Sequence, residues 1–213
     1  VDLTAELLDK LDIAWVPFHY ELDGVDHPDD LGQSMSFKEF YAAMTNGAET
    51  KTSQVNVEQY VEHFEHLLES NPRILHVCLS SGLSGSYNSA CIAADMVMKS
   101  HPGAQITVVD SLGASSGYGL IMDTLAERRA AGAGYEELCE WIEENRLKMH
   151  HWFFSTYLTF YIKGGRVSKT SGFFGTALHI CPLLNMSNEG GLVPREKIRS
   201  KSKTMAATLD KMV

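Results

Sequence analysis

Residues 73–98, R-I-L-H-V-C-L-S-S-G-L-S-G-S-Y-N-S-A-C-I-A-A-D-M-V-M, decide how the rest of the chain is interpreted. They open with the short apolar run 74–79, which is too brief for a helix and is typical of a buried strand. A helical pattern rich in Ala and Met begins at Tyr87, and the turn 80–86 between them contains only small residues apart from Leu83. A strand, a small-residue turn and a helix start bring unpaired N–H groups and hydroxyls to one point, which favours binding of an anion. The alternative is that the serines only cap the helix.

A second strand of the same kind follows at residues 105–109 and ends at Asp110-Ser111. Helical patterns come after it at 114–131 and 135–149, with Gly132 placed for a left-handed cap. Short apolar strands that alternate with helices predict a parallel sheet covered by helices. Ligands of such sheets bind beyond the carboxyl ends of the strands, where turn 80–86 and Asp110 both lie.

A second group of hydroxyls precedes another expected helix start. Thr52-Ser53-Gln54 comes just before Asn56, which forms a capping pair with Gln59. A capping box at 36–39 opens an earlier helix. The hydroxyls of Thr52 and Ser53 therefore have the same kind of setting as Ser84, and the two groups could converge on one anion.

The pattern changes near residue 150. Residues 180–186 and 192–198 read as strands joined by the hairpin signal 187–191, and 152–156 is also β-like. We therefore expect two domains, an α/β domain over 1–149 and a partial domain with an antiparallel sheet over 150–213. Further expectations are a helix at 3–11, a strand at 13–18, a loop at 23–33, and helices at 168–178 and 201–212.

Composition narrows the class of protein. The chain has 213 residues, a formal net charge of −9 and a sequence pI of about 5.4, which argues against a general nucleic-acid binder. Its four cysteines form no C-x-x-C and suit unpaired thiols in a reducing compartment, so a cytoplasmic protein is expected. Neither His63 with His66 nor His150 with His151 has partners at a recognisable metal-ligand spacing, so no metal site is predicted. The chain also lacks a P-loop.

Several short motifs occur in an order that resembles the DegV family of bacterial fatty-acid-binding proteins. They are T-S-Q at 52–54, S-S-G-L-S-G-S at 80–86, V-V-D-S at 108–111, K-G-G-R at 163–166, L-H-I-C-P-L-L at 178–184 and K-I-R at 197–199. The resemblance implies an α/β domain, a second domain with an antiparallel sheet, and one long-chain fatty acid held between them. It further implies a non-catalytic subunit that presents the acid's carboxylate to a separate ATP-dependent kinase, which makes an acyl phosphate. Contact with a membrane surface during lipid loading is left open.

The resemblance also assigns residues. The carboxylate is expected at the hydroxyls of Thr52, Ser53 and Ser84, beside Gly85, with Arg166 near the head group. The alternative for Arg166 is a salt bridge between the two domains. Arg199 matches a basic position facing the kinase. Apart from the fatty acid itself, no cofactor is expected. The family pattern has a strand before residues 2–4 and a further segment after residue 213, so both ends are expected to be truncated.

The chemistry of the residues agrees with such a ligand. A buried carboxylate has to be well paired, while an acyl tail gains about 0.8 kcal/mol for each buried CH₂ group. The second half contains apolar residues for that tail, and we assign the acyl pocket to Phe154, Leu158, Ile180 and Leu183. The alternative for each of these residues is an ordinary role in the core. The alternative function is an enzyme or phosphotransfer protein that uses Ser84 or Asp110 on a small phosphorylated or carboxylated metabolite.

Overall fold

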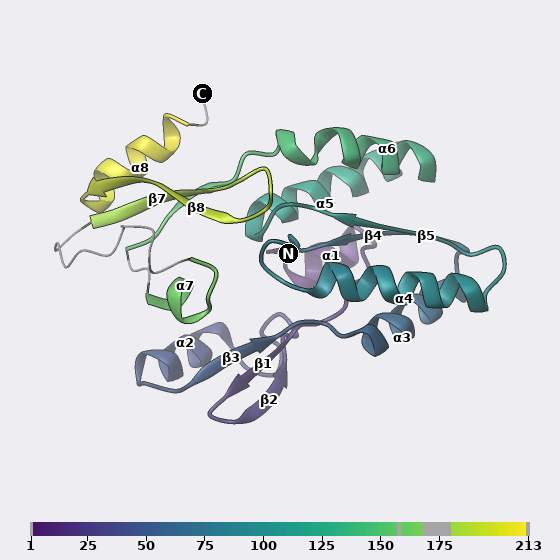
Figure 1. Cartoon of the computed structure of the whole chain (residues 1–213), viewed down its shortest axis with the longest axis horizontal. Helices are drawn as coiled ribbons and strands as arrows, with labels where there is room; N and C mark the ends of the chain where they lie inside the picture. The colour runs from purple at the N-terminus through teal and green to yellow at the C-terminus, as the bar shows by residue number, and fades with distance from the viewer. Residues whose placement is uncertain (1, 157–158, 168–179, 212–213) are drawn as a thin grey trace.

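A computed structural model describes residues 2–156, 159–167 and 180–211, and these residues form three separate sheets (Figure 1). The first sheet has the order β2-β1-β3, the second is the pair β4-β5, and the third has the order β6-β7-β8. The bounds of the strands are β1 His19–Leu22, β2 Val25–Pro28, β3 Thr50–Ser53, β4 Arg73–Cys78, β5 Gln105–Asp110, β6 Trp152–Phe154, β7 Ile180–Met186 and β8 Leu192–Arg199.

The parallel pair β4-β5 lies in the middle of the first half and confirms the prediction of a parallel sheet. Helices α3 (Val57–Leu68) and α4 (Ser86–Ser100) cover one face, and α5 (Ser115–Ala130) and α6 (Tyr135–Asn145) cover the other. Successive residues of a strand point to opposite faces, so a strand covered on both sides has to be apolar throughout. This is why runs 74–79 and 105–109 are largely hydrophobic, with His76, Gln105 and Thr107 as the exceptions.

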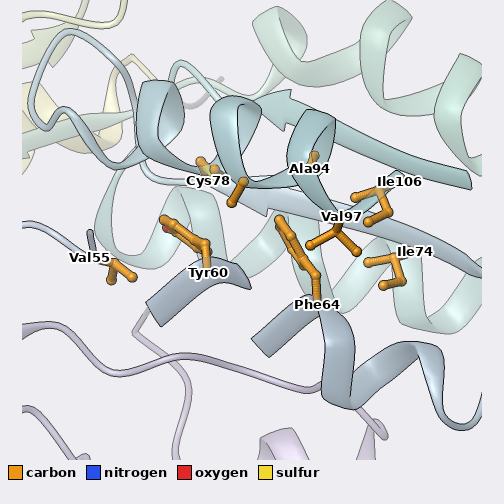
Figure 2. Packing of buried hydrophobic residues seen from close by; sticks show 10 residues of the cluster. Val55, Tyr60, Phe64, Ile74, Cys78, Ala94, Val97 and Ile106 are labelled. Atoms are coloured by element: carbon orange, nitrogen blue, oxygen red, sulfur yellow. The ribbon is translucent and has the colours of Figure 1, made fainter. Parts of the chain in front are cut away.

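The larger core lies between the parallel pair and helices α3 and α4 (Figure 2). Phe64 is its largest fully buried side chain and lies beside Tyr60, with the two ring centroids 5.8 Å apart. The helix α4 contributes small residues, Ala90, Ala93 and Ala94, which let its backbone approach the strands closely. This packing fixes where α4 begins, and with it the position of the serine turn.

The antiparallel sheet β2-β1-β3 corrects two predictions. Residues 25–28, expected as part of a loop, form β2 and pair with β1. Asp23-Gly24 makes the tight hairpin turn, with φ of 50° and 83°, which is a strong hairpin signal that the loop interpretation overlooked. Residues 13–18, expected as a strand, form no strand. Pro17 within this run has no N–H to offer to a neighbouring strand.

The second half contains the predicted hairpin. β7 and β8 pair antiparallel from Ile180 opposite Arg199 to Met186 opposite Leu192, with a register shift between Leu183 and Leu184. β6 adds to the other edge of β7, and α8 (Lys201–Leu209) contacts all three strands. The helix expected at 168–178 lies outside the described residues, and the division into two domains near residue 150 stays a prediction.

Helix starts follow their sequence signals closely. Ser36 with Glu39 opens α2 (Phe37–Thr45), and Asn56 with Gln59 opens α3, each through a complete capping box. Gly132 follows α5 with φ of 99°, as predicted. The remaining helices are α1 (Ala5–Lys10), α7 (Thr159–Lys163) and the 3₁₀ turn η1 (Arg146–Lys148). Among the described residues, no helix combines the length and apolar character needed to cross a membrane.

Candidate functional site

A cavity of about 560 Å³ lies where the first sheet, the serine turn and the segment after α7 meet. This volume falls in the range of about 300–1,000 Å³ that is usual for small-molecule sites. Thr52, Ser53, Ser84 and Arg166 all line it, so three of the sequence motifs are brought to one place. The other lining residues are Asp2, Phe18, His19, Tyr20, Asp29, Gln54, Leu79, Leu83, Ala114, Ser115, Tyr161, Gly164 and Leu192.

The serine turn is held by buried polar contacts on the side away from the cavity. Asp110 at the end of β5 accepts hydrogen bonds from the backbone N–H groups of Ser81 (3.1 Å) and Leu112 (3.0 Å). The hydroxyl of Ser80, which is fully buried, donates to the carbonyl of Gly190 at 2.7 Å and accepts from the N–H of Gly82. Asp110 and Ser80 are not among the described residues that line the cavity, and they act here on the backbone of the turn.

Ser84 projects a polarised hydroxyl at the start of α4. Its Oγ accepts from the N–H of Ser86 at 3.2 Å and lies 2.9 Å from the hydroxyl oxygen of Ser86. When Ser86 is the donor in that pair, Ser84 keeps its own proton to donate to a ligand. Ser84 therefore caps the helix only at the N–H of Ser86. The N-cap residue of α4 is Gly85, which makes no side-chain capping bond.

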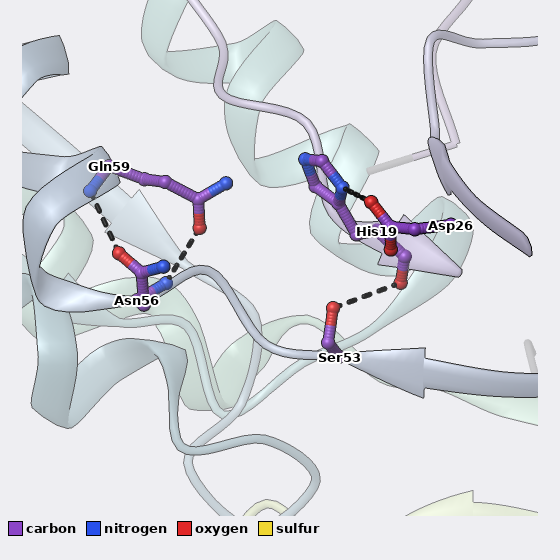
Figure 3. A network of polar contacts seen from close by, with 5 residues as sticks. All are labelled: His19, Asp26, Ser53, Asn56 and Gln59. Carbon is purple, nitrogen blue, oxygen red and sulfur yellow. Dashed lines mark hydrogen bonds and ion pairs between the residues drawn. The ribbon is translucent and has the colours of Figure 1, made fainter. Parts of the chain in front are cut away.

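Thr52 and Ser53 come from the last residues of β3, opposite Tyr20 and His19 of β1. The hydroxyl of Ser53 lies 3.5 Å from the carbonyl oxygen of His19, whose ring Nδ1 contacts Asp26 at 2.8 Å (Figure 3). Thr52 and Ser53 are both exposed rather than packed in a core, and both line the cavity. Helix α3, which follows, is capped by Asn56 and Gln59. Thr52 and Ser53 therefore end strand β3 and take no part in a helix cap.

Arg166 joins the second half of the chain to the serine turn. Its Nε donates to the carbonyl of Leu83 at 3.2 Å, and its Nη1 donates to the carbonyl of Gly164 at 2.5 Å. A guanidinium has five N–H donors, so these two bonds leave others for an anion. The cation is thereby fixed beside the residue that precedes Ser84.

Two tyrosines in the cavity wall were missed by the sequence analysis. Burial raises the pKa of Tyr161, with a further contribution from Tyr41, and burial together with Asp30 and Asp29 raises the pKa of Tyr20. Both phenols stay protonated at neutral pH, and the hydroxyl of Tyr20 donates to Sδ of Met35 at 3.6 Å. No sequence motif surrounds either residue, so only their position in the fold identifies them.

The three described residues predicted for the acyl tail lie elsewhere. Phe154 pairs with Leu183 across β6 and β7, Ile180 begins β7, and Leu183 is fully buried. None of the three is among the described residues that line the cavity, and Leu158 lies outside the described residues. Arg199 is exposed at the end of β8. The assignments of the tail pocket and of the partner contact stay predictions.

Within the part of the chain that the structure describes, no group of three or more His, Cys, Asp or Glu side chains could hold a metal ion. The cavity is lined by hydroxyls, two phenols and the guanidinium of Arg166, together with the carboxylates of Asp2 and Asp29. The hydroxyls and the guanidinium suit an anionic oxygen ligand, since charge-assisted hydrogen bonds are roughly twice as strong as neutral ones.

The model of a family of uncharacterised proteins, the DegV family, matches residues 1–213. A DegV domain-containing protein of Clostridium perfringens is 32% identical over 204 residues, which cover 96% of this chain and 70% of that protein. The chain spans 57 to 59% of the length of several other DegV domain-containing relatives.

The fold of this chain matches solved structures over most of its length. A DegV family protein of Thermus thermophilus, described by its fatty acid binding, is 28% identical with a TM-score of 0.85, covering 99% of this chain and 73% of that one. The fatty acid kinase (Fak) B3 protein of Streptococcus pneumoniae, loaded with linoleic acid, is 27% identical with a TM-score of 0.81. That match covers 92% of this chain and 68% of the streptococcal one.

Proposed function

This chain belongs to the DegV family, and from that premise we propose that it is a lipid carrier that holds a long-chain fatty acid by its carboxylate. The observation that carries the proposal is the convergence of Thr52, Ser53, Ser84 and Arg166 on one cavity. The hydroxyls and the guanidinium pair the carboxylate, and the N–H groups near Gly85 at the start of α4 add a positive dipole end.

The acyl tail supplies most of the affinity. Each CH₂ group that leaves water contributes about 0.8 kcal/mol, so a tail of ordinary length outweighs the pairing of the head group. Leu79, Leu83 and Leu192 line the cavity next to the hydroxyls and form the first apolar surface that the tail meets. We place the rest of the tail in the second half of the chain, near Phe154, Leu158, Ile180 and Leu183.

The carrier presents the carboxylate to a separate ATP-dependent kinase, with Arg199 on the docking face. This step rests on the similarity to the streptococcal fatty acid kinase protein. The alternative, a metabolite enzyme that uses Asp110, is disfavoured because Oδ1 of that carboxylate accepts from the backbone N–H groups of Ser81 and Leu112, and Asp110 is not among the described residues that line the cavity.

The test removes the proposed head-group donors. Thr52→Ala combined with Ser84→Ala should weaken fatty acid binding by at least tenfold, since a hydrogen bond to a charged group contributes about 1.5–3 kcal/mol. Because neither side chain is buried in the core, the melting temperature should stay close to that of the parent. The matched control, Thr50→Ala with Ser70→Ala, changes the same residue types outside the cavity and should bind normally.

Mass spectrometry of an organic extract of the purified protein distinguishes the two functions. Co-purified fatty acid in the parent, reduced in the double variant, supports the carrier. A double variant that retains full lipid occupancy would show that the head group is bound elsewhere, and turnover of a phosphorylated sugar in the absence of lipid would favour the enzyme.

A further inference from the structure

The side chain of Gln54 lies across the start of α4 and connects the two hydroxyl motifs. Its Nε2 donates to the hydroxyl of Ser89 at 3.3 Å, and Ser89 is 5% exposed in the first turns of that helix. Its Oε1 occupies the space beside Gly85, where a Cβ atom would lie only 2.1 Å away. Gln54 directly follows Thr52 and Ser53, while Gly85 directly follows Ser84.

Gly85 is not required here by backbone conformation. Its φ is −76°, which any L-residue adopts. The reason for a glycine at this position is therefore the carboxamide of Gln54, which fills the place of the missing side chain. Removing that carboxamide, or forcing it out with a methyl group, would free the strand end from the helix start.

We propose that Gln54 is a positioning residue that sets the spacing between the hydroxyls of Thr52 and Ser53 and the hydroxyl of Ser84. Gly85 leaves room for its carboxamide, because it has no Cβ atom. This inference rests on the proposed function, because the hydroxyls matter only if they bind one head group. Gln54 itself lines the cavity, and its positioning role follows from where its carboxamide is engaged. The β3 end and the α4 start come from different layers of the fold, and the hydrogen bond from Gln54 to Ser89 is a direct polar link between them.

The geometry predicts a strong dependence of one substitution on the other. Gln54→Ala and Gly85→Ala should each weaken binding of tetradecanoic acid by about tenfold, the loss expected when one hydrogen bond to a charged group is misplaced. In the Gln54→Ala background the methyl group meets no carboxamide, so adding Gly85→Ala should change the affinity by less than about twofold. A purely local effect of either residue would instead give losses that multiply.

A second ligand separates positioning from general damage. Tetradecan-1-ol has the same tail without the carboxylate, so its affinity should stay within about twofold of the parent in all three variants. Affinities are measured by displacement of cis-parinaric acid fluorescence, and thermal melting is followed in parallel. Because the clashing atom is the end of a flexible side chain, the melting temperatures should stay close to the parent value.

The matched controls are Gln105→Ala and Gly134→Ala. Gln105 is exposed at the start of β5, and Gly134 is the N-cap of α6 with the same φ of −76°, where a Cβ atom would meet nothing closer than 4.0 Å. Both should bind like the parent.

The outcomes separate the inference from its premise. If the parent binds neither ligand, the proposed function fails. If the parent binds the acid and Gln54→Ala binds it equally well, or if the two losses multiply, the positioning role is wrong while the carrier function stands. Equal loss of acid and alcohol would likewise overturn the positioning role.

Discussion

Replacing His76 with Phe should flatten the acid dependence of stability. His76 lies in β4 and faces α3, where its ring meets those of Tyr60 and Phe64 edge-on, each with a centroid distance of 5.2 Å. Burial lowers the pKa of His76 to about 3, with His63 as a second and smaller cause. Phe has a similar shape, cannot ionise, and suits an aromatic cluster of this kind.

The sign and size follow from linkage. The folded pKa lies below the unfolded value of about 6.5, so the unfolded state binds the proton more readily and stability is lost as pH falls from about 6.5 toward 3. If the ring were fully shielded from solvent, its low pKa would reduce the free energy of unfolding by about 3 kcal/mol between pH 7 and pH 4. His76 keeps some contact with solvent, and we therefore expect about 2 kcal/mol from this residue.

The assay is urea unfolding at pH 7, 6, 5 and 4, followed by circular dichroism. Carboxylates also contribute to acid sensitivity, so the quantity to compare is the difference between His76→Phe and the parent at each pH. That difference should grow by about 2 kcal/mol toward pH 4. The control, His66→Gln, alters a side chain that is 78% exposed and should follow the parent curve. Parallel curves for His76→Phe and the parent would refute the assignment of a buried neutral imidazole.

The remaining predictions concern the packing that holds the site. Gly190→Ala should destabilise by about 2 kcal/mol, because its Cβ would lie 2.0 Å from the hydroxyl oxygen of Ser80 and its φ is 74°. Gly24→Ala, with φ of 83° and open space around it, should cost about 1 kcal/mol. Equal losses of melting temperature in Gly24→Ala and Gly190→Ala would contradict the close contact between Gly190 and Ser80. Phe64→Ala should cost about 3–5 kcal/mol in urea unfolding, whereas Phe37→Ala, at a side chain 58% exposed, should cost little.

Much of the first half could be predicted because its signals are local. The apolar runs at 74–79 and 105–109 report burial on both faces, and the capping boxes at Ser36 and Asn56 mark helix starts directly. The hairpin at 187–191 is equally local. The strand β2 was missed although Asp23-Gly24 marks its turn, because its residues Val25–Pro28 lack an apolar alternation and pair at an edge of the sheet.

The cavity itself depends on contacts between residues far apart in sequence, and these leave no local pattern. Sequence motifs suggested that Thr52, Ser84 and Arg166 belong to one site, and the structure places them around one cavity. Tyr161 and Tyr20 also line it but sit in no motif. Whether Phe154, Ile180 and Leu183 contact a tail depends on how side chains from several elements combine, which periodicity does not reveal.

Contacts from both halves of the chain hold the serine turn, so the proposed head-group site depends on both halves. The serine turn is held from the parallel pair by Asp110 and from the β7-β8 hairpin by the bond between Ser80 and the Gly190 carbonyl. Arg166 from the second half adds a third contact, a hydrogen bond from its Nε to the carbonyl of Leu83. A shift of the hairpin would therefore carry the turn and its Ser84 hydroxyl with it, while Thr52 and Ser53 would stay with the first sheet. The affinity for a carboxylate should for this reason respond to changes at Gly190 even though the glycine does not line the cavity among the described residues.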